Sequence, residues 1–166
     1  GGAVLHGSGL TYALVWLSPP RKKRDAYHQA SQWLIKGFSE LGLSLRFGNK
    51  PAHSIDKNCF SASTTADLLD QFGEKRIGSA QLWKKGSLLQ HGEILLDPPR
   101  ELWEEVFEQE PPKPASEWVP RIGLEHYLYQ ATHYCWPEIT WQERPLTKEE
   151  LSQLKKNAKE YSLEIS

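Results

Sequence analysis

The sequence predicts an α+β fold, in which strands joined by local turns are interleaved with helices. Residues 66–72, 76–84 and 87–96 have the composition of three strands, and the turns Gly73-Glu74 and Lys85-Gly86 separate them. Helical apolar spacing precedes and follows this meander, without the regular strand-helix-strand alternation of a doubly wound sheet. A largely antiparallel sheet flanked by helices is therefore expected.

The segment before the meander is expected to hold three strands, a helix and a loop. A glycine turn separates short strands at residues 3–6 and 10–17. Apolar residues recur at helical spacing over residues 25–41, which predicts one amphipathic helix. A further strand at residues 43–47 then leads into an irregular loop at residues 48–63, which contains proline, asparagine and several small polar residues.

The segment after the meander is expected to be helical and interrupted by prolines. A helix should follow Pro98-Pro99, and the run Pro111-Pro112-Lys113-Pro114 predicts a stiff linker. The sequence Thr147-Lys148-Glu149-Glu150 fits a capping box and predicts another helix, whose apolar residues fall on one stripe. The expected organisation is a domain core over residues 1–110, a proline-rich linker over 111–116 and a helical extension of the same domain over 117–166.

The composition fits one globular domain and argues against nucleic acid and membrane as partners. The chain has 166 residues, 39% of them hydrophobic and 25% charged, and its formal net charge is -1. It therefore lacks the basic excess that nucleic-acid binding usually needs, and no run of about 18 apolar residues predicts a membrane span. Cys59 and Cys135 have neither the spacing of a disulfide framework nor that of a zinc site. We expect a monomeric cytoplasmic protein with free thiols and no metal.

Three motifs, in this order, resemble those of the lipoate-protein ligase and octanoyltransferase family. They are Gly1-Gly2-Ala3-Val4-Leu5-His6, Lys75-Arg76-Ile77-Gly78-Ser79-Ala80-Gln81 and Leu89-Gln90-His91-Gly92-Glu93-Ile94-Leu95-Leu96. Each motif alone is weak, whereas the ordered set is specific, and it implies the family's catalytic fold with a mixed, largely antiparallel sheet. The chain has no methionine and opens inside the first motif. The N-terminal part of the family's domain, with the arginines that precede the glycines, is therefore expected to be missing.

The resemblance also implies an acyl or acyl-adenylate site. Its expected lining, by resemblance, consists of Gly2, Ala3, Val4, Leu5, Lys75, Gly78, Ser79 and Ala80. Glycine lets a ligand approach the backbone because it has no Cβ, and a lysine ammonium stabilises negative charge that develops on an acyl carbonyl or phosphate. Taken singly, Gly1-Gly2 fits a plain hairpin turn and Lys75 a solvated edge residue.

Cys59 separates the two main branches of the family. Octanoyltransferases of the LipM type are similar in carrying a Cys-Phe pair before the motif lysine, and Cys59-Phe60 stands one residue further from Lys75 than that pattern has it. A free thiol is mostly protonated at neutral pH, and a nearby ammonium favours the reactive thiolate. Cys59 and Lys75 are therefore the expected catalytic residues. The alternative for Cys59 is an unreactive loop thiol.

The expected function is transfer of an octanoyl group from acyl carrier protein to Cys59, and then to a lysine of a lipoyl domain or of glycine-cleavage H protein. His6 and His91 are candidates for polar support around the site, with a structural role as the alternative for each. No permanently bound cofactor is expected. An ATP-dependent lipoate-protein ligase, which would use lipoate, ATP and magnesium, is the first alternative. A non-catalytic family member that binds carrier domains is the second.

Overall fold

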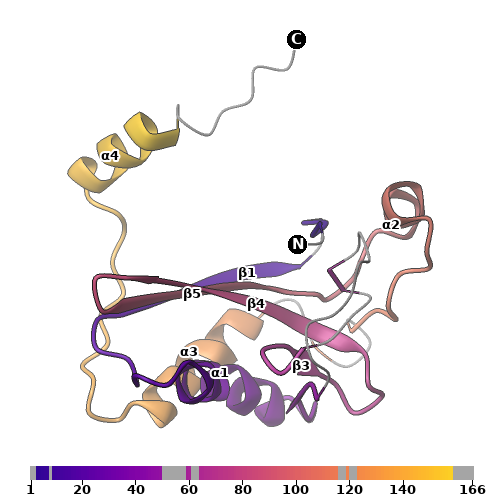
Figure 1. The fold of residues 1–166 in the computed structure, drawn as a ribbon, viewed down its shortest axis with the longest axis horizontal. Helices are drawn as coiled ribbons and strands as arrows, with labels where there is room; N and C mark the ends of the chain where they lie inside the picture. Colours follow the sequence, from indigo (N-terminus) through magenta and orange to yellow (C-terminus); the bar gives the residue numbers. More distant parts are fainter. Residues whose placement is uncertain are drawn as a thin grey trace.

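The fold is an antiparallel sheet with two helices packed against one face (Figure 1). The computed structural model describes residues 3–7, 9–49, 59–60, 64–115, 119 and 123–158. Its elements in chain order are β1 (Leu10–Trp16), α1 (Lys23–Glu40), β2 (Arg46–Phe47), β3 (Leu68–Leu69), β4 (Lys75–Lys84), β5 (Ser87–Ile94), α2 (Arg100–Phe107), α3 (Leu124–Cys135) and α4 (Lys148–Ala158). The strands form one sheet in the order β1-β5-β4-β3-β2, and every pair is antiparallel. The α+β class is thus confirmed.

The long strands of the sheet are those predicted from the hairpin pattern. β4 and β5 pair from Lys84 with Ser87 to Ile77 with Ile94, and β1 pairs with the other edge of β5. Lys85 and Gly86, with φ of 51° and 80°, turn the chain between β4 and β5. Positive φ at both turn positions matches the right-handed twist of the strands, and glycine adopts it without strain. By contrast, β2 and β3 keep only two residues each of the longer strands expected there.

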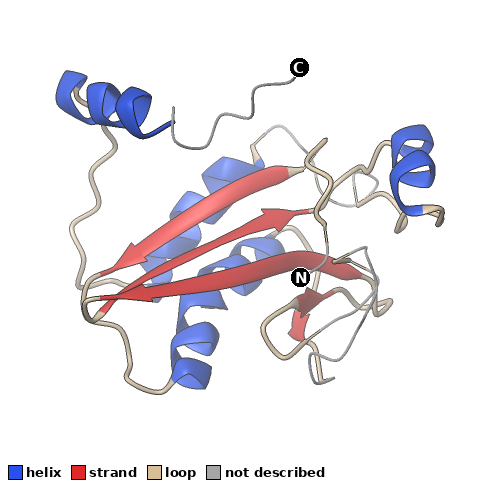
Figure 2. Cartoon of the chain, turned by 45° about the horizontal axis from the view of Figure 1, so that its top comes forward, coloured by secondary structure: helices blue, strands red, loops and turns tan. Residues whose placement is uncertain are grey.

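Helices α1 and α3 cover the same face of the sheet, as Figures 1 and 2 show. Apolar residues of both helices and of the strands interlock into the main core, which we call the helix-side core. Its fully buried members include Leu34, Phe38, Leu68, Ile77, Ile94 and Leu124. The predicted helix over residues 25–41 is confirmed as α1, whereas α3 was not anticipated as a separate helix.

The opposite face, which we call the open face, carries a smaller apolar cluster at one end. Trp103 and Phe107 of α2 pack there with Phe60 and Leu95, and Leu5 lies against them. Trp103 is fully buried, and its ring meets those of Phe60 and Phe107 edge-on. These contacts bring the N-terminal segment, the Cys59 loop and α2 to one end of the sheet.

The proline-rich segment is held against the body of the domain. The backbone amide of Ala115 donates to Leu96 O, and the guanidinium of Arg76 donates to Lys113 O. Ala115 and Val119 are fully buried in the helix-side core. The segment expected as a linker thus packs like a loop of the same domain.

Helix α4 begins with the predicted capping box. Thr147 N donates to Glu150 Oε2 at 2.8 Å, and Glu150 N donates to Thr147 Oγ1 at 3.2 Å. Its apolar residues Leu151 and Leu154 are exposed rather than buried. Among the described helices, none combines the length and the apolarity that a membrane crossing requires.

Candidate active site

Lys75 is the buried cation at the start of β4. The pairing of β3 with β4 slips by one residue here, because Leu68 pairs with Ile77 and Leu69 with Lys75. Such a bulge redirects side chains beside the extra residue. The Lys75 side chain is only 4% exposed, and its Nζ forms an ion pair with Asp67 Oδ1 at 3.1 Å. Its position is therefore not that of a solvated edge lysine.

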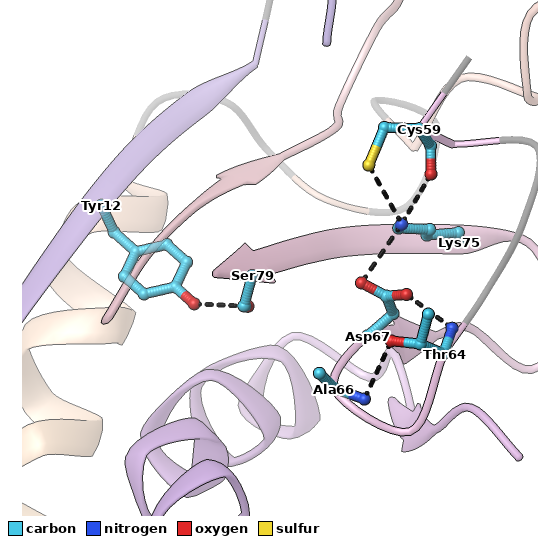
Figure 3. A network of polar contacts seen from close by, with 7 residues as sticks. All are labelled: Tyr12, Cys59, Thr64, Ala66, Asp67, Lys75 and Ser79. Atoms are coloured by element: carbon cyan, nitrogen blue, oxygen red, sulfur yellow. Dashed lines mark hydrogen bonds and ion pairs between the residues drawn. The ribbon is translucent and has the colours of Figure 1, made fainter. Parts of the chain in front are cut away.

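Cys59 lies directly beside this ammonium. Lys75 Nζ donates to Cys59 O at 2.7 Å and lies 3.8 Å from Cys59 Sγ (Figure 3). Cys59 N donates in turn to Ala3 O at 3.0 Å. Three segments that are far apart in the sequence therefore meet here: the first motif, the Cys59 loop and the motif lysine. Gly2 lies outside the described residues, so Ala3 is the residue of the first motif that is described in contact with Cys59.

Asp67 is a member of the cluster that sequence reasoning did not identify. A tight turn holds it, in which Thr64 N donates to Asp67 Oδ2 at 2.6 Å and Ala66 N donates to Thr64 Oγ1 at 3.2 Å (Figure 3). One carboxylate oxygen is thus occupied by the turn and the other by Lys75. The only sequence signal was an acidic residue directly before the apolar pair Leu68-Leu69, which is also typical of an ordinary strand start.

Phe60 completes the wall around the ammonium. Lys75 Nζ lies 5.1 Å from the centre of the Phe60 ring, within the range of a cation-π contact. A Cβ added to Gly78 would lie 3.2 Å from Lys75 Cε and 3.6 Å from Phe60 Cζ. Gly78 therefore leaves the space that the lysine chain occupies, and it lies on the same face as the Lys75 side chain.

The three small residues of the lysine motif divide between the two faces of β4. Gly78 and the exposed Ala80 share the open face, since side chains alternate along a strand. Ser79 points the other way, where its Oγ lies 2.6 Å from Tyr12 Oη (Figure 3). Of these residues, Gly78 and Ala80 lie on the side of Lys75.

Ser79 belongs to a buried polar network beneath the sheet. Gln90 is fully buried, and its Nε2 lies 3.1 Å from Tyr12 Oη and 3.2 Å from Ser31 Oγ. Gln81 Nε2 donates to Gln90 Oε1 at 2.7 Å. Burial raises the pKa of the Tyr12 phenol, which keeps it neutral as a hydrogen-bond partner. The glutamines of both motifs thus stabilise the sheet against α1, and they do not face Cys59.

His6 follows Leu5 onto the open face. Its Nδ1 lies 2.8 Å from Glu93 Oε2, and Glu93 is only 4% exposed. Val4, just before Leu5, is at the surface. The other candidate histidine, His91, is exposed on the same face of β5. The structure therefore gives His6 a specific buried partner.

Comparisons with known proteins agree with this architecture. Residues 1–128 match the lipoyl protein ligase A/B catalytic domain. Proteins named octanoyltransferase LipM from Halalkalibacterium halodurans and Bacillus subtilis are 36% and 37% identical over 110 residues, covering 58% of this chain and 39% of theirs. The chain spans about two fifths of the length of these curated relatives.

A solved structure agrees at the level of the fold. The bipartite lipoate protein ligase of Thermoplasma acidophilum, solved with its E2 lipoyl domain, superposes with a TM-score of 0.72 at 20% identity, covering 99% of this chain and 66% of that one. The same fold therefore persists at low identity. Since the family match covers most of the sequence, the chain belongs to the lipoyl protein ligase A/B catalytic domain family.

Proposed function

We propose that the protein carrying this chain transfers an octanoyl group to a lysine of lipoyl carrier domains through a thioester on Cys59. The observation that carries the proposal is the buried ammonium of Lys75, 3.8 Å from Cys59 Sγ. A cation at this distance can stabilise the negative charge that develops on the sulfur and on the thioester oxygen during acyl exchange. The similarity to relatives named octanoyltransferase LipM supports the same chemistry.

The first half-reaction is a thioester exchange. The Cys59 thiolate attacks the carbonyl carbon of an octanoyl thioester on acyl carrier protein, the bond to the carrier sulfur breaks, and the carrier thiol takes up the proton that Cys59 lost. Lys75 Nζ, the nearest cation to the thiol in the described cluster, stabilises the oxyanion that forms in between.

The second half-reaction forms the amide. The amine of the target lysine attacks the Cys59 thioester, the carbon–sulfur bond breaks, and the amine gives up one proton as the Cys59 thiol is restored. The acceptors are lipoyl domains or glycine-cleavage H protein. Free thiols at Cys59 and Cys135 suit a reducing compartment, so we place the reaction in the cytoplasm.

The open face offers a surface for the octanoyl tail. Gly78 and Ala80 lead away from Lys75 along β4, and the exposed Leu82 follows them on the same face. Leu82 pairs with Leu89 of β5, and Leu89 pairs in turn with Val15 of β1, which is also exposed. Small residues next to the reacting group and apolar residues further along fit an acyl chain that lies across the strands.

The test compares the two cysteines of the chain. Full-length protein is incubated with octanoyl-acyl carrier protein without ATP and weighed by intact mass spectrometry. We expect the mass of one octanoyl group, removable with neutral hydroxylamine, in the wild type and in Cys135→Ser, and none in Cys59→Ser. If carrier acylation instead requires ATP and survives Cys59→Ser, the protein is a ligase and Cys59 is an ordinary loop cysteine.

A further inference from the structure

A buried carboxylate on the open face is not used by the steps above. Glu93 of β5 is only 4% exposed, and in the sheet it lies directly between Gly78 of β4 and Thr11 of β1. A buried carboxylate is costly unless it is paired or hydrogen-bonded. The hydrogen bond from His6 Nδ1, at 2.8 Å, is such a contact.

This contact fixes how His6 presents its ring. An ionised carboxylate can only accept a hydrogen bond, so Nδ1 carries the hydrogen and donates to Glu93. Nε2 is then the ring nitrogen that can take up a proton. The His6 side chain is 59% exposed, so an incoming group can reach it, while its partner Glu93 is buried. A buried acidic partner below an accessible imidazole is the arrangement that orients a general base.

The pair lies next to the Cys59 cluster. His6 is three residues from Ala3, whose carbonyl accepts from Cys59 N, and the intervening Leu5 packs in the cluster of Phe60. Glu93 faces Gly78 across the β4–β5 ladder, and the Lys75 chain fills the space over Gly78. Cross-strand neighbours on one face have Cβ positions about 5 Å apart. Glu93 and Lys75 therefore flank the same glycine.

We propose that His6, held by Glu93, accepts the proton that the target lysine amine releases when it attacks the Cys59 thioester. The inference rests on the proposed function, whose second step needs a base. Lys75 cannot serve while it is an ammonium, and both carboxylate oxygens of Asp67 are engaged. The amine nitrogen forms the amide bond, its proton moves to His6 Nε2, and the electron pair of the broken carbon–sulfur bond leaves on Cys59. That thiolate then recovers the proton from His6.

The experiment separates the two half-reactions in the full-length protein. The enzyme is first loaded with octanoyl-acyl carrier protein and then mixed with saturating lipoyl domain, and the decay of the thioester is followed by quenched mass spectrometry from acid to alkaline pH. The variants are His6→Gln and Glu93→Gln. The matched control is His91→Gln, since His91 is an exposed histidine on the same face.

We expect His6→Gln to load at the wild-type rate within about twofold but to transfer about 10²-fold more slowly, the range of general-base losses. The pH profile of the transfer step should differ between the wild type and His6→Gln, because the glutamine side chain cannot accept the proton of the attacking amine. Glu93→Gln should slow transfer about tenfold, because an amide can also stabilise the other imidazole tautomer. His91→Gln should behave as wild type in both steps.

Other charged groups around His6 also shape the pH profile, and all of them are unchanged in His6→Gln. They are His91 on β5, Lys75 with Asp67 beside β4, and Asp97 and Arg100 on either side of Pro98-Pro99, where Pro99 lies against Gly7. The comparison of His6→Gln with wild type isolates the His6 contribution.

Three results would overturn the proposal. Transfer by His6→Gln at the wild-type rate and with an unchanged pH profile would exclude His6 as the base and leave the proposed function standing. Equal slowing of loading and transfer would make His6 a structural residue. Absence of any thioester on wild-type Cys59 would overturn the proposed function and this inference with it, and the loading step reports that outcome separately.

Discussion

Two neighbouring cations at the start of β4 form buried ion pairs with quite different surroundings. Arg76 Nε donates to Asp70 Oδ2 at 2.7 Å, and Asp70 Oδ1 accepts from the backbone amides of Phe72 and Glu74. The Arg76 guanidinium also donates to Lys113 O. Every one of these partners is either backbone or a fully buried carboxylate, so this pair connects β4 to the turn before it and to the proline-rich segment.

The Lys75–Asp67 pair is buried like the Arg76–Asp70 pair, but its other partners are different. Lys75 Nζ has Asp67 on one side and the Cys59 carbonyl and thiol on the other. A buried ion pair is weak evidence for function, because desolvation offsets much of its attraction and many such pairs are structural. The difference between the two pairs therefore lies in the third partner: only Lys75, of these two cations, is described beside a nucleophilic atom.

The largest expected effect is loss of the Arg76 pair. In Arg76→Met, Asp70 remains buried without its guanidinium and Lys113 O loses a donor, which should cost about 3–5 kcal/mol of unfolding free energy. Urea denaturation followed by tryptophan fluorescence measures it. The control is Arg100→Met, since Arg100 pairs with Glu104 at the surface and its loss should leave the midpoint unchanged. Similar midpoints for both variants would mean that burial does not distinguish these pairs.

The second expected effect is on chemistry rather than on folding. The double variant Lys75→Met with Asp67→Asn leaves neither charge of this pair buried without its partner and preserves an acceptor for Thr64 N, so its unfolding free energy should stay within about 1 kcal/mol of wild type. Thioester formation on Cys59 should nevertheless fall by about 10²–10³-fold, as on removal of one oxyanion donor. Intact-mass time courses measure the rate. Wild-type rates in a stable double variant would place Lys75 with Arg76, as a structural cation.

Local sequence signals predicted the elements that local geometry decides. The Lys85-Gly86 turn and the capping box at Thr147 depend on residues adjacent in the chain, and both occur as expected. The exposed stripe of α4 shows the limit of this reasoning, because periodicity reveals which residues share a side but not what that side contacts. Helix α3 was not predicted as a separate element within the helical extension over residues 117–166, and in the structure it packs against α1.

The site was predictable only in part. Sequence reasoning named Cys59 and Lys75, which the fold does bring together, and gave His6 as a candidate for polar support. It did not separate the faces of β4, so Ser79 was grouped with Gly78 although the pleat turns it to Tyr12. Asp67 and Glu93 could not be recognised as partners, because the contact of Asp67 with Lys75 depends on the pairing of β3 with β4, and that of Glu93 with His6 joins residues 87 positions apart.

The smallest expected effect concerns a third ion pair, which extends the comparison to the surface. Arg144 donates to both carboxylate oxygens of Glu150 at 2.8 Å, and the two side chains are 52% and 41% exposed. The Arg144 hydrogen bond, followed by that from Thr147 N, lowers the pKa of Glu150 from 4.5 to about 2. Because the folded pKa is below the ordinary value, this contact stabilises α4 above about pH 4.5 and the stabilisation is lost as the pH falls through about 2.

Carbon-detected NMR of the Glu150 carboxyl measures this directly. The midpoint should lie near 2 in the wild type and move upward in Arg144→Gln, where the first cause of the shift is removed. The global urea midpoint should be the same in both proteins, since an exposed pair contributes little to stability even in good geometry. Arg144→Gln thus provides the reference for the two buried pairs. It changes a titration without changing the global stability, whereas Arg76→Met lowers the stability and the Lys75 double variant lowers the rate of thioester formation. An unmoved Glu150 midpoint would show that the carboxylate owes its acidity to the helix start rather than to the arginine.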